Sequence, residues 1–247
     1  MIIAHQVIVN CFRYLLEGMT EAEVLAIDRQ ADVPNCGVTL APGAIAEKLA
    51  HLADKFDAVV IGPGFESSPA LLADIASLLP KFTQAKVILD ACAMNAVSSV
   101  RPGNDRSARP LPILLTPHAG EMAHLCRLSK DEVTAAPVEV LQRSVAKWNT
   151  VIALKGATTR VANPEGRLWE HRSGSPGLGI SGSGDTLAGI IGGLAARGAS
   201  LEQACVWGVA LHARAGAALA EKMGPLGYLA RELSAEVPRL MHGMAPN

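Results

Sequence analysis

The sequence predicts an α/β fold in which helices flank a mostly parallel central sheet. Four short apolar runs each end in a glycine or a polar residue, and helical segments separate them, as a parallel sheet with right-handed crossovers requires. Apolar residues make up 49% of the chain but aromatic residues only 4%, so the core must be built from Ala, Leu, Val and Ile, as in buried parallel strands. The length of 247 residues fits a single domain over residues 1–247.

Residues 1–55 contain the weakest patterns in the chain. A strand is expected near Val7–Asn10, and Met19–Arg29 has helical spacing after a threonine that suits a helix N-cap. A turn over 34–37 leads to an amphipathic helix over Ile45–Leu52. No candidate for chemistry lies in this part of the sequence.

Buried strands are predicted from residue 58 onward, because four continuous apolar runs are too short for helices. These strands are Ala58–Ile61, Lys86–Asp90, Ile113–Thr116 and Val151–Leu154. The residues at their carboxyl ends are Gly62-Pro63-Gly64, Asp90, Pro117–Glu121 and Lys155-Gly156. Since ligands bind at the carboxyl ends of the strands in open α/β sheets, these residues are where we expect a site.

The remaining elements follow from turn and helix signals. A helix over Leu71–Leu79 stops at a proline, and Thr158–Ala162 and Arg167–His171 form a hairpin around an Asn-Pro-Glu-Gly turn. The predicted helices of the carboxyl-terminal part begin at Ser183 and span Leu201–Lys222 and Arg231–Met241.

Composition excludes several classes of partner and location. The net charge is −1 and the Lys and Arg residues are scattered, which argues against nucleic acid and anionic lipid as partners. No apolar run reaches the ~18 residues of a membrane span, and the first twenty residues carry no export signal. Five cysteines without CxxC spacing indicate reduced thiols, so we expect a cytoplasmic protein.

The strongest candidate for a site is the stretch 172–195. Five glycines within its first half predict a loop, which leads into an apolar helix at Ser183. Such a junction presents free N–H groups and a partial positive charge that suit phosphate. Asp185 falls in the first helical turn, where the helix end favours its ionised form, as a base or metal ligand would need. The alternative is that Ser183 or Asp185 only caps the helix.

Four further residues are candidates at the strand ends. His118 and Glu121 could bind a polar ligand or simply cap a helix. Asp90 is either a functional carboxylate or a turn initiator, and Lys155 either neutralises phosphate or is a solvated strand end. No His/Cys spacing indicates zinc, so any metal would be Mg²⁺ that arrives with a nucleotide.

Three common motifs are absent. The chain has no Walker loop, no strand-proximal GxGxxG with a downstream acid, and no GxSxG elbow after a strand. The usual phosphate cradles and the serine hydrolase arrangement are therefore excluded.

Five motifs nevertheless occur together and in order. They are Gly62-Pro63-Gly64, Leu89-Asp90-Ala91, Thr116–Glu121, Leu154–Ala157, and the segment from Gly174 to Gly189. This series resembles that of the ADP/ATP-dependent NAD(P)H-hydrate dehydratases of the ribokinase-like superfamily. The resemblance covers roughly residues 56–242 and implies a three-layer ribokinase-like fold.

The resemblance also implies an activity. In this family ADP or ATP, with Mg²⁺, phosphorylates the ring hydroxyl of hydrated NADH or NADPH, and loss of phosphate restores the nicotinamide. The net reaction is a dehydration that repairs the cofactor. A homo-oligomer is expected as well.

Roles for single residues follow from the same resemblance. Asp185 would accept the proton of the attacking hydroxyl, and the hydrated dinucleotide would bind at Asp185, Gly64 and His118. The residues expected to bind the nucleotide and its phosphates are Lys155, Gly156, Ala157, Gly182, Ser183 and Gly184. Asp90 and Glu121 would lie behind them as supporting polar groups, and no protein metal ligand is expected.

The chain departs from the family pattern at several places. Residues 1–55 lack the strand and glycine-rich turn that usually open these proteins, so this part is divergent or truncated. Cys92 replaces the second Asp of an Asp-Ala-Asp-Ala turn, Ser175 replaces an Asn, and Phe65-Glu66 follows the first motif where the family has a leucine and a glycine.

Two other functions stay open at this point. A kinase of the same superfamily, acting on a vitamin alcohol or a sugar, would share the glycine-rich junction, although the turn with His118 and Glu121 argues against it. A catalytically impaired nucleotide-binding protein is compatible with Cys92 and the divergent start.

Overall fold

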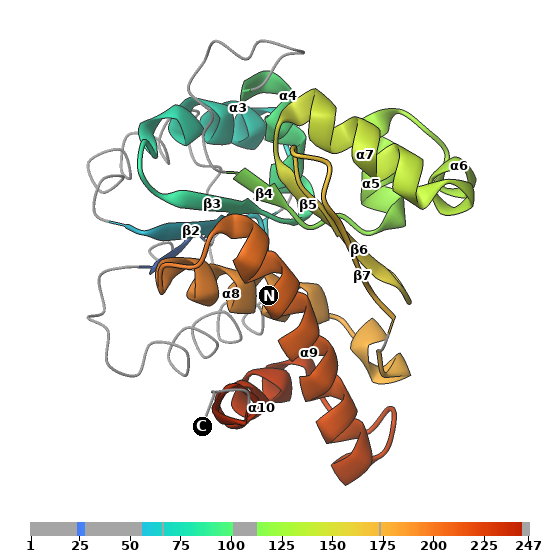
Figure 1. Ribbon diagram of the computed structural model, residues 1–247. Helices are drawn as coiled ribbons and strands as arrows, with labels where there is room; N and C mark the ends of the chain where they lie inside the picture. The colour runs from blue at the N-terminus through green and yellow to red at the C-terminus, as the bar shows by residue number, and fades with distance from the viewer. Residues whose placement is uncertain (1–23, 28–55, 66, 101–112, 173, 244–247) are drawn as a thin grey trace.

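The computed structural model describes residues 24–27, 56–65, 67–100, 113–172 and 174–243 (Figure 1). A seven-stranded sheet with the order β1-β2-β3-β4-β5-β6-β7 runs through them. Its strands are β1 (Val24–Ile27), β2 (Ala58–Ile61), β3 (Lys86–Leu89), β4 (Ile113–Leu115), β5 (Val151–Leu154), β6 (Thr159–Ala162) and β7 (Leu168–His171). Strands β1 to β5 are parallel, and β6 and β7 are antiparallel additions. The predicted parallel sheet and hairpin are confirmed.

Helices connect the strands. The α-helices are α3 (Pro69–Leu78), α4 (Val97–Val100), α5 (Ala119–Cys126), α6 (Lys130–Ala135), α7 (Pro137–Trp148), α8 (Ser183–Ala196), α9 (Leu201–Met223) and α10 (Ala230–His242). Short 3-10 helices are η2 (Leu79–Lys81), η3 (Ala91–Ala96) and η4 (Pro176–Gly179).

Strand β1 corrects one prediction. The helix expected over Met19–Arg29 is wrong at Val24–Ile27, which pairs in parallel with Ala58–Ile61. The four residues form a continuous apolar run like that of β2, and pairing at the sheet edge satisfies their backbone groups. The strand expected near Val7–Asn10, the turn over 34–37 and the helix over Ile45–Leu52 lie outside the described residues.

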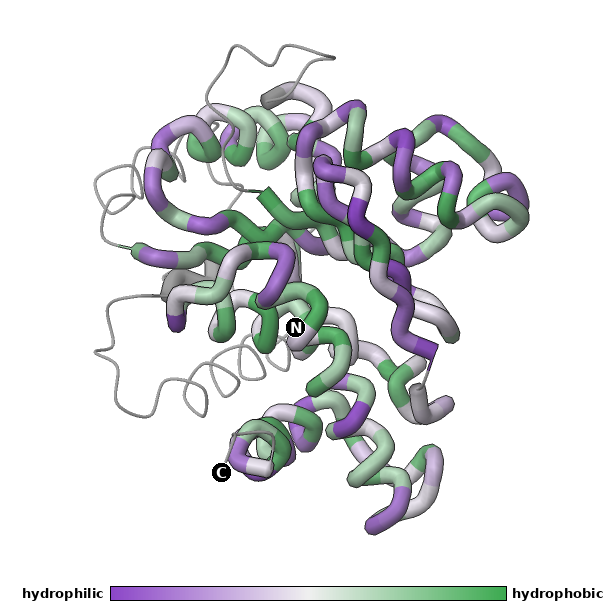
Figure 2. Tube along the Cα trace, in the orientation of Figure 1, coloured by the Kyte–Doolittle hydropathy of each residue, from purple (hydrophilic) through white to green (hydrophobic). Residues whose placement is uncertain are grey.

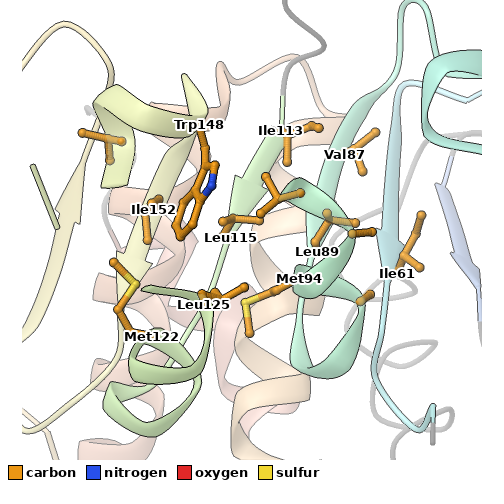
Figure 3. Close-up of a cluster of buried hydrophobic side chains, with 14 of the residues drawn as sticks. Ile61, Val87, Leu89, Met94, Ile113, Leu115, Met122, Leu125, Trp148 and Ile152 are labelled. Carbon is orange, nitrogen blue, oxygen red and sulfur yellow. The ribbon is translucent and has the colours of Figure 1, made fainter. Parts of the chain in front are cut away.

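Side-chain alternation along the strands builds two cores, one on each face of the sheet. Val59 and Ile61 point to the face covered by α3, α5 and α7, where Trp148 lies against the strands (Figure 3). Ala58 and Val60 point to the opposite face, which α8 and α9 cover. Strands in the middle of the sheet are coloured as hydrophobic along their length, whereas the outer hairpin carries hydrophilic residues (Figure 2). The result is a three-layer α/β arrangement.

Helix α8 belongs to the core of the chain. Most of its side chains are buried, and it packs closely on α9, because a Cβ added at Gly208 would lie 2.5 Å from Ile191 Cγ1. A helix of small residues permits this close approach. The packing fixes the start of α8 at the carboxyl edge of the sheet.

The turn after β2 also reaches that edge. The Phe65 N–H donates to the Gly62 carbonyl at 3.0 Å, and Gly64 has a φ of +81°, as expected for a turn with Pro63 and Gly64 at its centre. Gly62 has a φ of +128°, and a Cβ there would lie 1.9 Å from the Asp90 carbonyl oxygen. Only glycine therefore allows the chain to pass the end of β3.

Candidate functional site

A cavity of about 660 Å³ opens at the carboxyl edge of the sheet, between β5, the loop before α8, and α9. Six of the predicted site residues line it: His118, Lys155, Gly156, Ala157, Ser183 and Gly184. Asp90, Glu121, Asp185, Gly64 and Gly182 do not line it. The structure thus brings together strand ends and a helix start that are far apart in the sequence.

The start of α8 has the form expected of an anion site. Gly182 is the N-cap, with a φ of +84°, and the Thr186 N–H donates to its carbonyl. The alternative in which Ser183 or Asp185 only caps the helix does not hold, since Gly182 is the N-cap and Ser183 is the first helical residue. Gly184, one position later, has no intrahelical acceptor for its N–H. Asp185 lies in the first turn and is half-buried.

Lys155 lies against this helix start. Its Nζ is 3.0 Å from Asp90 Oδ1 and 3.9 Å from Glu121 Oε2, and its side chain is 18% exposed. A Cβ added at Gly184 would lie 3.2 Å from the same Nζ. Lys155 is therefore not a solvated strand end. Its ammonium adds a full positive charge to the partial charge of the helix N-terminus.

Asp90 is the buried partner of Lys155. The residue is 2% exposed, and its Oδ1 accepts the Thr116 hydroxyl at 2.6 Å as well as the Lys155 ammonium. Its side chain makes no capping bond to the following η3 helix. Asp90 opens this turn through its backbone, since its carbonyl accepts the Ala93 N–H at 3.2 Å, whereas its carboxylate bonds Thr116 and Lys155.

His118 and Glu121 form a reciprocal capping box at the start of α5. His118 Nδ1 accepts the N–H groups of Gly120 and Glu121, and Glu121 Oε2 accepts the His118 N–H at 2.7 Å. Because Nδ1 accepts these bonds, Nε2 is the ring nitrogen that can donate to another group. The capping alternative is confirmed. Nε2 lies 3.6 Å from Glu121 Oε2, beyond hydrogen-bond distance, so the exposed ring can still donate to a ligand.

A second cavity, of about 340 Å³, also borders His118. Cys92, Asn95, Glu121 and His124 contribute to its wall. His118 is thus a wall residue of both cavities. Gly64 lines neither of them.

Sequence reasoning missed the role of His212. This buried residue of α9 lines the larger cavity, and its Nε2 lies 3.0 Å from Ser183 Oγ. Burial lowers the pKa of His212 to about 4, so the ring is neutral at physiological pH. Its place in a small-residue helix of the carboxyl-terminal part, where Gly208 and Gly216 allow close packing, is a signal in the sequence.

Part of the lining of the larger cavity is apolar. Leu178 and Ile180 of the loop and Val209 and Ala213 of α9 contribute to it. The loop is held against α9, because a Cβ added at Gly216 of α9 would lie 2.7 Å from Leu178 Cδ2. The lining of the cavity therefore combines charged and apolar groups.

No group of three or more His, Cys, Asp or Glu among the described residues is arranged to hold a metal ion. Cys92, Cys126 and Cys205 are free thiols, and burial raises the pKa of Cys92 and Cys205. None of the helices in the described ranges is long and apolar enough to span a bilayer.

Comparison with known proteins identifies the family. The profile of the NAD(P)H-hydrate dehydratases matches residues 23–239. The chain belongs to the NAD(P)H-hydrate dehydratase family. The match begins before the first signature motif and includes β1, so it covers the whole described sheet.

One relative and two solved structures are similar to this chain. The chain is 45% identical over 187 residues to the ADP-dependent (S)-NAD(P)H-hydrate dehydratase of Xanthomonas campestris, covering 75% of this chain and 61% of the relative. It resembles the crystal structure of the Bacillus subtilis ADP/ATP-dependent NAD(P)H-hydrate dehydratase with ATP and Mg²⁺, with a TM-score of 0.66 at 29% identity over 76% of this chain and 64% of that one. A ribokinase-like superfamily protein of Enterococcus faecalis has a TM-score of 0.74 at 24% identity over 96% and 82% of the two chains.

These comparisons confirm the predicted ribokinase-like fold and the predicted family. The chain spans about three fifths of the length of the Xanthomonas campestris dehydratase.

Proposed function

We propose that the protein dehydrates hydrated NADH or NADPH with ADP or ATP as co-substrate, a hydro-lyase reaction that repairs the cofactor. The observation that carries this proposal is that His118 borders two cavities, with Lys155 and the start of α8 in the wall of the larger one. Two substrates can then bind next to the same imidazole. Family membership supports the choice of these two substrates.

The larger cavity is the proposed nucleotide side. Its volume of about 660 Å³ lies within the usual range for small-molecule sites. The apolar side chains of Leu178 and Val209 in the wall suit a purine ring, and Gly156 and Ala157 line the cavity next to Lys155. The terminal phosphates would reach Lys155 and the N–H of Gly184, where both charges favour an anion. Gly182 and Ser183 would shape this turn without a charge of their own.

The smaller cavity is the proposed dinucleotide side. His118 Nε2–H can donate to the hydrated dinucleotide while Glu121 holds the ring through the capping box. Gly64 would form part of the wall beyond this cavity. Asp185, in the first turn of α8, would accept the proton of the ring hydroxyl as that oxygen attacks the terminal phosphoryl group. Phosphate then leaves and the nicotinamide is restored.

Phosphoryl transfer requires little covalent chemistry from the protein. Positioning of the two substrates and neutralisation of phosphate charge supply most of the rate. Mg²⁺ bound to the nucleotide would neutralise further charge on the phosphates. Asp185 is the carboxylate nearest in sequence to the phosphate-binding turn.

The two alternatives are not favoured. A kinase for a small alcohol needs no second cavity that extends past His118 toward Cys92 and Asn95. An impaired nucleotide-binding protein needs no half-buried carboxylate in the first turn of α8, where Asp185 lies. Restored nicotinamide is a product of the dehydratase alone, so its formation distinguishes the proposed function from both alternatives.

Asp185→Asn tests the proposal. We expect this change to reduce nucleotide-dependent dehydration by at least roughly a hundredfold, the usual contribution of a general base, while ADP still binds. Asp131→Asn is the matched control, because Asp131 also lies in the first turn of a helix but far from the site, and it should leave turnover unchanged. Undiminished turnover in Asp185→Asn would remove Asp185 from the mechanism.

The proposal includes three expectations about the protein as a whole. Free cysteines without CxxC spacing favour a cytoplasmic setting. Residues 1–247 are proposed to act as one domain. Trp207 and Leu226 are exposed apolar side chains, which supports a homo-oligomer. Sedimentation of the purified protein would test the assembly.

A further inference from the structure

Five elements meet at one buried charge cluster beside the nucleotide cavity. Asp90 follows β3, Thr116 follows β4, Lys155 follows β5, Glu121 belongs to α5, and Gly184 lies in the first turn of α8. The Lys155 ammonium is the centre of the cluster, with Asp90 Oδ1 at 3.0 Å and Glu121 Oε2 at 3.9 Å. One cation therefore faces two carboxylates.

The two carboxylates differ in what they can do. Asp90 lies within hydrogen-bond distance, is buried, and is itself held by the Thr116 hydroxyl at 2.6 Å. Glu121 lies beyond hydrogen-bond distance from Nζ, and its Oε2 already accepts the backbone N–H of His118. Asp90 is thus the group that fixes the lysine. Glu121 contributes charge at longer range.

Lysine needs such a fixed partner in this place. Its ammonium is a point charge on a flexible four-carbon stem, so by itself it does not hold one position. The ammonium has three N–H donors and Asp90 uses one, so the others remain available for phosphate oxygens. Because a Cβ added at Gly184 would lie only 3.2 Å from Nζ, an ammonium held by Asp90 already lies at the start of α8.

We propose that Asp90, held by Thr116, is a positioning residue that fixes the Lys155 ammonium at the start of α8, where the terminal phosphates of the nucleotide bind. This inference rests on the proposed function only in taking a nucleotide as the anion. Asp90 does not touch the nucleotide. Its negative charge by itself repels phosphate, so its benefit acts through Lys155 alone.

A double-mutant cycle on ADP binding tests the proposal. The variants are Asp90→Asn, Lys155→Met and their combination, and the readout is the ADP dissociation constant by calorimetry. Lys155→Met should weaken binding roughly tenfold or more, as expected for loss of a charged hydrogen bond. Asp90→Asn should weaken binding several-fold when Lys155 is present. In the Lys155→Met background the same change should leave binding unchanged or tighten it, because only the repulsive charge is then removed.

Other results of the cycle overturn the proposal. If Asp90→Asn tightens ADP binding in both backgrounds, Asp90 is only a repulsive charge. If it weakens binding in both, its role is general folding of the site. Asp74→Asn, a buried aspartate of α3 outside the cluster, controls for the loss of any buried carboxylate and should leave ADP binding unchanged.

Substitutions of Thr116 test the same idea without a change of charge. Thr116→Ser keeps the hydroxyl and should bind ADP as the wild type does, whereas Thr116→Val should weaken binding in the direction of Asp90→Asn. Equal affinities of the two variants would overturn the proposed role of the hydroxyl, and the pair remains informative if Asp90→Asn does not fold. A wild-type protein that binds ADP without dehydrating hydrated NADH overturns the proposed function alone. One that binds neither ADP nor ATP overturns both.

Discussion

The buried histidine of α9 makes the stability of the fold depend on pH. His212 has a pKa of about 4 in the fold, against an ordinary value of 6.5, because burial disfavours its charged form. Between these two values the unfolded chain binds a proton that the fold excludes, so the free energy of unfolding falls as pH falls through this window. The full difference corresponds to roughly 3 kcal/mol, at about 1.4 kcal/mol for each tenfold change in proton affinity.

His212→Gln isolates this contribution. Glutamine can still bond Ser183 Oγ but does not titrate, so urea unfolding of the variant should show a flatter dependence on pH between 6.5 and about 4 than the wild type. His124→Gln replaces an exposed histidine and should keep the wild-type slope. The Glu236 carboxyl, whose pKa is lowered chiefly by its hydrogen bond from Lys222, loses its contribution only below its ordinary value of 4.5. Equal slopes for His212→Gln and the wild type would refute the argument.

Two further predictions concern stability. Gly62→Ala should lower the free energy of unfolding by more than roughly 2 kcal/mol, because the new Cβ meets the Asp90 carbonyl at a strained φ, whereas Gly166→Ala, also at positive φ but in open space, should cost roughly 1 kcal/mol. Trp148→Ala should cost about 3–5 kcal/mol by opening a cavity between α7 and the sheet, whereas exposed Trp207→Ala should cost under about 1 kcal/mol. Urea titrations of the four variants give the free energy of unfolding of each. Equal losses of this free energy within a pair would contradict the packing argument.

The central part of the fold could be predicted because buried parallel strands have a simple pattern. Ala58–Ile61 and Val151–Leu154 are continuous apolar runs with no competing helical spacing, and both are strands with these bounds. Val24–Ile27 is also such a run, but helical spacing around it concealed the strand. Pairing with β2 decides its conformation. This pairing is a tertiary contact, which the local sequence pattern does not contain.

The site could be predicted in part for a related reason. The strand ends and the glycine-rich helix start predict that Lys155 and Gly184 lie at the same edge of the sheet. The structure brings these two residues together. The contact of Asp90 with Lys155 joins residues 65 positions apart, and the pairing of Ser183 with His212 depends on how α8 packs on α9. Neither contact has a local pattern, so neither could be read from spacing alone.

The most direct test of the central claim follows both products of one reaction. Purified protein is incubated with hydrated NADH, Mg²⁺ and either ADP or ATP, and released phosphate and restored nicotinamide absorbance are measured together. The account predicts equal amounts of both, with no reaction when the nucleotide is left out. An accumulating phosphate ester without restored absorbance, or no turnover with either nucleotide, would contradict it.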